Sequence, residues 1–310
     1  MKGIFYSVIV IMMIAPIVMY IVLYLGTTET QVEEISAKIK GDKMISYSKS
    51  VEQDLVRVLD ITAKISISAA VSYIDMNGIP LNNSNDRLIE IMENGTIYGS
   101  EFALLDSNSL KDWIAEVEAK SNNYGFHTKI NVIYINITPY DSFNLLLSAL
   151  VSVNITDNRA MKIYKIYNQT NIISIEGLED PLYGLETNGL LKRKFTRGTI
   201  NSTEDLDNAV ANHLYINSTQ GASFLDRLEG SLTTSSKYSN MTSNQIGLET
   251  IVYLPDLSGA GLHVKTDQTN VDYLYFNEST FIGYPVNNTG YSWLKIDEEH
   301  ASIYNVDLIK

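Results

Sequence analysis

The strongest hydrophobic pattern in the chain is an uncharged run from Ile4 to Leu25, IFYSVIVIMMIAPIVMYIVLYL. At about 1.5 Å per residue, a helix over this run would be roughly 33 Å long, close to the hydrocarbon thickness of a bilayer. A secretory signal has a shorter apolar core and a cleavage site of small residues, which Leu23-Tyr24-Leu25-Gly26 does not resemble. The pattern therefore predicts an uncleaved transmembrane anchor over residues 1–28.

Two features predict the orientation of this anchor. Lys2 lies on the short side of the apolar run, and basic residues favour the cytoplasmic side. The rest of the chain contains ten Asn-x-Ser/Thr motifs, an excess of about twofold, which is typical of a glycosylated exterior surface. An Asn/Ser/Thr-rich composition is the alternative source of these motifs. We expect a single-pass protein of the cell membrane, with its N-terminus cytoplasmic and its C-terminal domain extracellular and glycosylated at Asn82, Asn94, Asn136, Asn154, Asn168, Asn201, Asn217, Asn240, Asn277 and Asn287.

Residues 29–78 continue in a helical pattern and are predicted to form an amphipathic stem. Mostly apolar positions recur at steps of three and four, with charged residues between them, which indicates one buried helix face. Gly41 is a candidate kink, and Gly78-Ile79-Pro80 marks the end of the helix. Two interpretations fit this pattern. The segment is either an ordinary core helix or a stem that leaves the membrane and packs against the head with its distal half. The positions of the stripe are Met44, Tyr47, Val51, Leu55, Val58, Thr62, Ile65 and Ala69.

Residues 79–190 are predicted to form a first α+β head domain. Its strand patterns follow one another with short connections, which indicates an antiparallel sheet that the stem covers on one face. The first strand has apolar residues at both alternating sets of positions, so we expect it to be buried on both sides. The expected helices are residues 84–93 and 109–119, the second with Ser109 as cap and Asp112 three positions on, and the expected strands are 128–137, 144–153 and 161–174.

Residues 191–310 are predicted to form a second, β-rich head domain, after a loop at 176–184. The fold class is therefore α+β: an N-terminal transmembrane helix continues into a long amphipathic helix, followed by an antiparallel-sheet head that divides into two subdomains in one interpretation. In this second region we expect helices at residues 204–213 and 223–230, a loop at 231–244, and strands at 248–254, 271–276, 291–296 and 302–308.

Composition and motif spacing limit the partners and the kinds of functional site that the sequence predicts. The net charge of −13 makes nucleic acid an unlikely partner, and the absence of Cys excludes disulfides, thiolate catalysis and Cys-based zinc sites. The four His are far apart in the sequence, and there is no Gly-rich phosphate loop. We therefore expect no cofactor, no metal site and no catalytic residue, and the sequence gives no support for an enzyme.

Four local patterns remain as candidates. Asp226 and Glu229, with Arg227 between them, are predicted to be a surface ion-pair set and alternatively a carboxylate dyad. The run 297–300, DEEH, is predicted to be a solvated turn and alternatively a cation or acid–base site. The basic cluster Lys192-Arg193-Lys194 with Arg197 fits a linker or a contact for an acidic neighbouring subunit. An aromatic-rich segment fits core strands, a sugar-binding face or a subunit interface through Tyr273, Tyr275, Phe276, Phe281, Tyr284, Tyr291 and Trp293.

Residues 1–70 of the chain resemble archaeal type IV pilin-like proteins. Lys2-Gly3 leads directly into the apolar helix with Pro16, and an amphipathic helix and a β-rich head follow. In that family a membrane peptidase cuts after a short basic leader that ends in Gly, so the resemblance implies processing between Gly3 and Ile4. Many pilins carry Glu at the fifth position after the cut, where this chain has Val8.

A second resemblance covers two short stretches of the head, GLEDPLYGLETNG at residues 177–189 and GASFLDRLEG at residues 221–230. They are similar to an uncharacterised group of archaeal membrane-anchored surface proteins, and this likeness implies no particular activity.

Three functions are compatible with the sequence. The first is a structural or adhesive surface protein, including a minor pilin-like subunit whose helix packs beside other such helices in a homo- or hetero-oligomer. The second is a stand-alone module, anchored through residues 4–25, that binds a glycan or another envelope component. The third is an exported hydrolase, which would need two acids that converge in a cleft.

Overall fold

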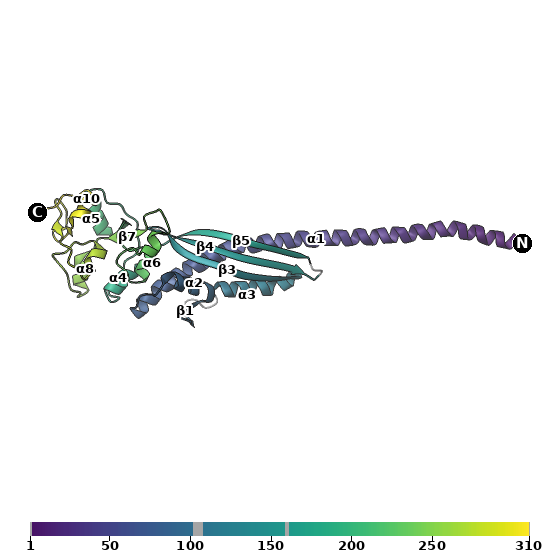
Figure 1. Ribbon diagram of the computed structural model, residues 1–310, viewed down its shortest axis with the longest axis horizontal. Coiled ribbons are helices and arrows are strands. Elements are labelled where there is room, and N and C mark those ends of the chain that lie inside the picture. The colour runs from purple at the N-terminus through teal and green to yellow at the C-terminus, as the bar shows by residue number, and fades with distance from the viewer. Residues whose placement is uncertain (1, 102–107, 159–160, 310) are drawn as a thin grey trace.

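The fold begins with one helix, α1, which runs without interruption from Lys2 to Asn77. The computed structural model describes residues 2–101, 108–158 and 161–309, and within these ranges the side chains of residues 2–11, 27–33 and 239 lie outside the described set. At 1.5 Å per residue α1 is about 114 Å long, and its N-terminal part projects from the head while its C-terminal half packs against it (Figure 1). The apolar run and the predicted stem therefore belong to a single helix.

A three-stranded antiparallel sheet lies against the C-terminal half of α1 (Figure 1). Its strands are β3 (Phe126–Asp141), β4 (Asn144–Asp157) and β5 (Lys162–Ser174), in that spatial order. In the turn between β3 and β4, the Asp141 carboxylate accepts a 2.8 Å hydrogen bond from the backbone N–H of Phe143. The three predicted strands and their antiparallel pairing are confirmed.

The prediction that the first strand is buried on both sides is wrong, because β3 contains a bulge. Its pairing with β4 is irregular between Val132 and Tyr134. Before this point the even-numbered positions 126, 128 and 130 are buried, and after it the odd-numbered Ile135 and Ile137 are buried. One extra residue turns every following side chain to the opposite face, so β3 has apolar residues of both parities and a single buried face.

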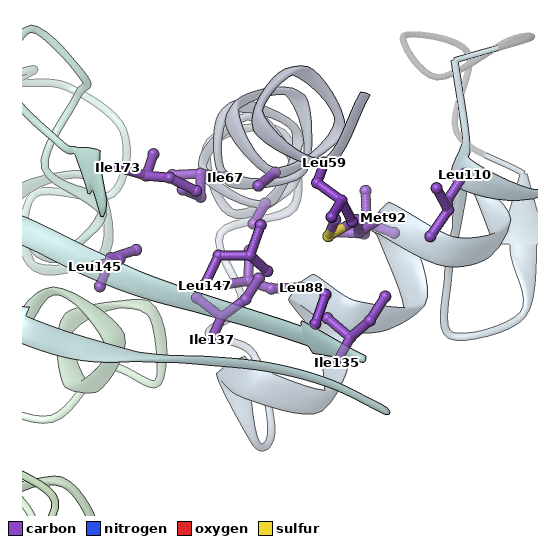
Figure 2. Packing of buried hydrophobic residues seen from close by; sticks show 14 of the residues in the cluster. Leu59, Ile67, Leu88, Met92, Leu110, Ile135, Ile137, Leu145, Leu147 and Ile173 are labelled. Atoms are coloured by element: carbon purple, nitrogen blue, oxygen red, sulfur yellow. The ribbon is translucent and has the colours of Figure 1, made fainter. Parts of the chain in front are cut away.

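The core between α1 and the sheet is apolar, and α2 (Ser84–Asn94) and α3 (Leu110–Ser121) pack beside α1 and β3. The predicted helices are thus present, and Ser109 and Asp112 form the predicted reciprocal cap of α3. The apolar stripe on α1 is confirmed, since its members are buried or partly buried against the core. Figure 2 shows side chains from six elements meeting here: Leu59, Ile67, Leu88, Met92, Leu110, Ile135, Ile137, Leu145, Leu147 and Ile173.

Short elements make up the rest of the described chain. In the first half these are β1 (Thr96–Ile97), β2 (Ser100–Glu101) and the 3-10 helix η2 (Asn122–Tyr124). The second half contains α4 (Pro181–Glu186), α5 (Thr203–Asn212), β6 (Tyr215–Ser218), α6 (Phe224–Leu228), α7 (Ser236–Ser239), β7 (Gly247–Thr250), α8 (Leu254–Gly259), α9 (Asp272–Tyr275), β8 (Tyr284–Pro285), β9 (Lys295–Ile296) and α10 (Glu298–Tyr304). Here β6 pairs with β7 and β8 with β9, both antiparallel.

Several predictions for this second half are wrong. The segment 271–276, expected as a strand, contains helix α9, and the first three residues of the expected strand 302–308 are the end of helix α10. The expected loops at 176–184 and 231–244 contain the start of α4 and the whole of α7. In a short apolar run there are too few positions to distinguish the two-residue period of a strand from the 3.6-residue period of a helix. Only the capping residues then indicate which of the two forms. The helices predicted at 204–213 and 223–230 are confirmed as α5 and α6.

The coarse fold class is confirmed as α+β with antiparallel sheets. The largest apolar core extends from α1 and the sheet into the second half, where it includes Leu225 and Leu248. A separate cluster, with Leu206 and Tyr304 among its members, holds the C-terminal end of the head together.

Candidate functional site

The projecting part of α1 carries an exposed apolar band, formed by residues Met12–Leu25. Its large apolar side chains are between 49% exposed (Ile21) and 73% exposed (Met12). They cover all sides of the helix rather than one stripe, and the rings of Tyr20 and Tyr24 stack on one another with centroids 6.2 Å apart. A helix that is apolar all round is typical of a segment that other apolar material surrounds.

The beginning of the apolar run, residues 4–11, lies outside the described side chains, and so do Gly3 and Ile4 of the predicted processing site. Within the part of the chain that the structure describes, no helix has both the length and the apolar character needed to cross a membrane. The anchor and the processing site therefore stay predictions from the sequence.

A groove of about 610 Å³ lies between α1 and α3, on the side of the head from which α1 projects. Its walls include Tyr47, Tyr124 and Phe126, whose ring centroids are 5.7 Å (Tyr47–Tyr124) and 5.5 Å (Tyr47–Phe126) apart. Tyr124 is 68% exposed, so its ring is accessible from solvent. An aromatic wall beside hydrogen-bonding groups suits a polar ring such as a sugar. The polar groups at the groove are those of Lys43, Ser46, Ser50, Asp54, Lys120 and Asn123.

Sequence reasoning missed this groove. Tyr47 was identified only as part of the α1 stripe, and the segment between α3 and β3 received no prediction. The groove forms because η2 brings Tyr124 back against α1 from a position 77 residues further along the chain. The aromatic pair Tyr124 and Phe126, beside the Asn-rich Asn122-Asn123, was the available signal.

The predicted basic cluster is largely paired within the chain. Three of its four residues make salt bridges with carboxylates from α1, α8 and the segment before α4. The structure thus favours salt bridges within the chain over a surface that binds an acidic neighbouring subunit. The pairs are Lys192 with Asp75 and with Glu179, Arg193 with Asp256, and Arg197 with Glu176.

Two acids meet at Lys192, in a groove of about 440 Å³ beside the end of α1. The Lys192 ammonium donates to Asp75 at 2.6 Å and to Glu179 at 2.8 Å. Burial raises the pKa of Asp75, and the hydrogen bond from Lys192 lowers the pKa of Glu179. The Lys192 ammonium therefore forms salt bridges with both carboxylates, and these connect α1 to the second half of the chain.

The prediction of a surface ion-pair set at 226–229 is wrong, because two of these side chains are buried. Asp226 caps its own helix reciprocally with Ser223. Glu229 accepts hydrogen bonds from the backbone N–H and hydroxyl of Ser84, at 2.7 and 2.8 Å, and so caps α2 from 145 residues away. Each acid thus caps a different helix, Asp226 capping α6 and Glu229 capping α2.

Arg227 lies at the centre of a buried ionic cluster and is fully inaccessible to solvent. Its guanidinium donates to Asp180 at 2.6 Å and to Asp272 at 2.8 Å, and also to the backbone carbonyl of Leu248 at 2.6 Å. The Tyr215 hydroxyl donates to Asp180 at 2.8 Å. Burial raises the pKa of Asp272 to about 6, although Arg227 opposes this shift. The cluster thus joins α4, α6 and α9.

The DEEH run is the start of α10 rather than a solvated turn, which corrects the prediction for Asp297 and His300. His300 is 2% exposed, and its Nδ1 lies 2.8 Å from the Asp297 carboxylate, while its Nε2 lies 3.4 Å from Glu249. Burial opposes the charged imidazole, but these two carboxylates outweigh it and raise the pKa of His300 to about 9. His300 is thus buried in the C-terminal core and forms an ion pair with the partly exposed Asp297.

The C-terminal aromatics do not form one exposed face. Tyr273 and Tyr275 are each 2% exposed and belong to two separate clusters. Tyr291 and Trp293 pack with each other, at 5.4 Å between centroids, and both contact Tyr253. The core interpretation therefore holds for Tyr273, Tyr275, Tyr291 and Trp293.

None of the ten predicted glycosylation asparagines is buried. Asn136, Asn154 and Asn277 are partly exposed, and the others are exposed. In the described part of the chain, no group of three or more acidic or His side chains could hold a metal ion. No protein-family model, curated protein or solved structure matches the chain.

Proposed function

We propose that this chain is a membrane-anchored extracellular surface protein with a structural or adhesive role. The observation that carries the proposal is the apolar band, Met12–Leu25, exposed around the whole circumference of a helix that projects from the head. Full burial of one such side chain is worth about 1.5–3 kcal/mol, so covering the band is worth on the order of 20 kcal/mol. A bilayer, or a bundle of similar helices, supplies that cover.

The direction of the anchor follows from the two ends of the band. Lys2 favours a cytoplasmic N-terminus, and the opposite end of α1 leads into the head. This direction places all ten glycosylation motifs outside the cell, and the exposure of their asparagines is consistent with sugar attachment.

The finer proposal is a pilin-like subunit whose apolar band leaves the bilayer and packs beside the helices of other subunits. Its support is a single uninterrupted helix that supplies both the apolar band and one wall of the head core. The alternative is that the band remains in the bilayer.

The N-terminal sequence of the native protein decides between these two forms. A protein that begins at Ile4 supports processing after Gly3 and a filament subunit, and one that begins at Met1 supports a permanent anchor. Recovery of the full chain in the soluble fraction of lysed cells, without detergent, would overturn both.

A matched pair of variants tests the band itself. Val18→Arg places a charge within the band, and Ile39→Arg places the same charge on α1 beyond it, at a comparably exposed position. An arginine at the centre of a membrane span costs about 2.5–3.5 kcal/mol on insertion scales. We expect Val18→Arg to reduce the membrane-bound fraction several-fold and Ile39→Arg to leave it unchanged.

The groove beside α3 supports a second candidate, a glycan-binding module. Its open Tyr124 ring and polar rim are the supporting observation. Tyr124→Ala should abolish glycan retention, while Tyr164→Ala, a similarly exposed tyrosine outside the groove, should leave it intact. Equal loss in both variants would argue against the groove. The hydrolase remains a prediction from the sequence.

A further inference from the structure

The outer face of the sheet, opposite α1, combines exposed apolar side chains with a glycosylation motif. Along β5 the even-numbered positions from Lys162 to Ser174 are all exposed. Among them Tyr164, Ile166 and Ile172 are each more than half exposed, and Asn168 lies at the centre of the series.

Neighbouring strands extend this apolar face. Asn168 lies opposite Leu150 of β4, which in turn lies opposite Tyr134 of β3. Tyr134 and its neighbour Ile133 are 52% and 53% exposed. Asn168 thus lies in one cross-strand row with two apolar side chains, at the edge of the sheet.

The two edge strands of this sheet differ in protection. β3 has a bulge and contains Pro139, and α2 covers part of it. The side-chain Oδ1 of Asn85 in α2 accepts a 3.0 Å hydrogen bond from the backbone N–H of Ile137. Bulges, prolines and covering helices are the usual means of blocking unwanted strand pairing.

Beyond Lys165, β5 has no bulge and no proline, and the helix that packs against it, α1, lies on the buried side, where the Tyr167 hydroxyl is 3.2 Å from that of Ser48. From Ile166 to Ser174 it reads IYNQTNIIS, nine residues without a charge, Pro or Gly. No strand in the described ranges pairs with its outer edge. Uncharged segments of high β-propensity with Asn and Gln are the segments that pair with copies of themselves.

We propose that an N-linked sugar on Asn168 covers this edge and keeps β5 from pairing with a second copy. The inference rests on the proposed extracellular position of the head. The Asn168–Gln169–Thr170 motif lies in the middle of the unprotected segment, on the exposed face, so a sugar there covers both the edge and Ile166.

The attachment is a group transfer from a lipid-diphosphate-linked oligosaccharide, the donor class we propose. The Nδ2 of Asn168 forms a bond to C1 of the first sugar while the bond from C1 to the diphosphate oxygen breaks. Nδ2 loses one proton, and the lipid diphosphate is the leaving group.

The test uses the full chain purified in detergent from the cells that produce it. Glycopeptide mass spectrometry should find Asn168 occupied in most molecules. Thr170→Ala removes the motif and leaves Asn168 in place, whereas Thr170→Ser keeps the motif. We expect Thr170→Ala to form sedimenting oligomers at least several-fold faster than the wild-type chain, and Thr170→Ser to match the wild type.

A rescue variant separates edge protection from folding. Adding Ile172→Lys to Thr170→Ala puts a charge on the same exposed face, and we expect it to restore the monomer. Sugars at Asn201 and Asn287 with none at Asn168 would overturn this inference and leave the extracellular position intact. Complete absence of sugar from all ten motifs would overturn the extracellular position too. Loss of the Asn168 sugar without any change in assembly would overturn the covering role.

Discussion

The two halves of the head bury different kinds of side chain. Between residues 34 and 175, the buried polar groups are almost all Ser or Thr, and among the charged residues described there only Asp157 is buried. Between residues 176 and 309, five charged residues and His300 are buried. The five are Asp180, Asp226, Arg227, Glu249 and Asp272.

This difference follows the length of the elements. α1 and the strands β3 to β5 are long enough to present continuous apolar faces, and their periodic side chains form the core without help. The second half consists of helices of four to ten residues and strands of two to four. Such elements bury little apolar surface each, so specific ion pairs and caps define how they meet.

The largest expected effect in this comparison is that of Arg227→Met. The substitution leaves the Asp180 and Asp272 carboxylates buried without their cation, and breaking a buried ion pair in this way costs about 3–5 kcal/mol. Chemical denaturation of the wild-type and variant chains measures the loss in the free energy of unfolding.

Asp272→Asn is the matched control, because it removes one charge and leaves Arg227 paired with Asp180. We expect a loss of about 1 kcal/mol, the size of one hydrogen bond. Equal losses in the two variants would show that the Asp272 carboxylate alone accounts for the contribution of Arg227.

Leu59→Ala tests the apolar half in the same assay. Leu59 is 0% exposed in the core of Figure 2, near Met92, and a Leu→Ala substitution at such a site costs about 3 kcal/mol through lost burial and a cavity. Ile61→Ala, on the exposed side of the same turn at 54% exposure, should cost under about 0.5 kcal/mol. A large effect of Ile61→Ala would indicate a partner that covers this face.

The same difference explains which parts of the structure the sequence could predict. The stripe from Met44 to Ala69 and the strands β3 to β5 repeat a period over many residues, so their faces are visible in the sequence. The bulge after Val132 adds one position without a distinctive residue, and it reverses the faces that simple alternation predicts.

The buried clusters could not be predicted, because their members are distant in sequence. Asp180 and Asp272 lie 47 and 45 residues from Arg227, and only the fold brings them together. Local signals did exist for the helix starts: Asp180 precedes Pro181, and Ser223 lies three residues before Asp226. These signals predict where a helix begins but not what its side chains contact.

A pH effect should be specific to the second half. The folded-state pKa of His300 is raised to about 9 from an unfolded value of about 6.5, so its contribution to stability is complete below pH 6.5 and is lost as the pH rises through 9. Between pH 7 and pH 8.5 we expect the free energy of unfolding to fall by about 2 kcal/mol.

NMR titration of the imidazole ring of His300 measures its pKa directly. Glu249→Gln removes one of the two carboxylates at the ring and should lower that pKa and flatten the stability change. An unchanged titration in Glu249→Gln would contradict the assigned contact.

The smallest expected difference between two variants is that between helix caps of the same design, one in each half. Ser109 with Asp112 caps α3, and Ser223 with Asp226 caps α6, and in both the serine hydroxyl donates to the aspartate at 2.5 Å. Asp112 is exposed, whereas Asp226 is 1% exposed and burial raises its pKa.

Ser109→Ala should cost about 1 kcal/mol, the usual value of a cap, because water replaces the lost hydrogen bond to Asp112. Ser223→Ala should cost about 2 kcal/mol, because Asp226 loses a partner that water cannot replace. Equal losses would mean that burial does not change the value of a cap here, and that the two halves differ in composition but not in how their polar contacts contribute to stability.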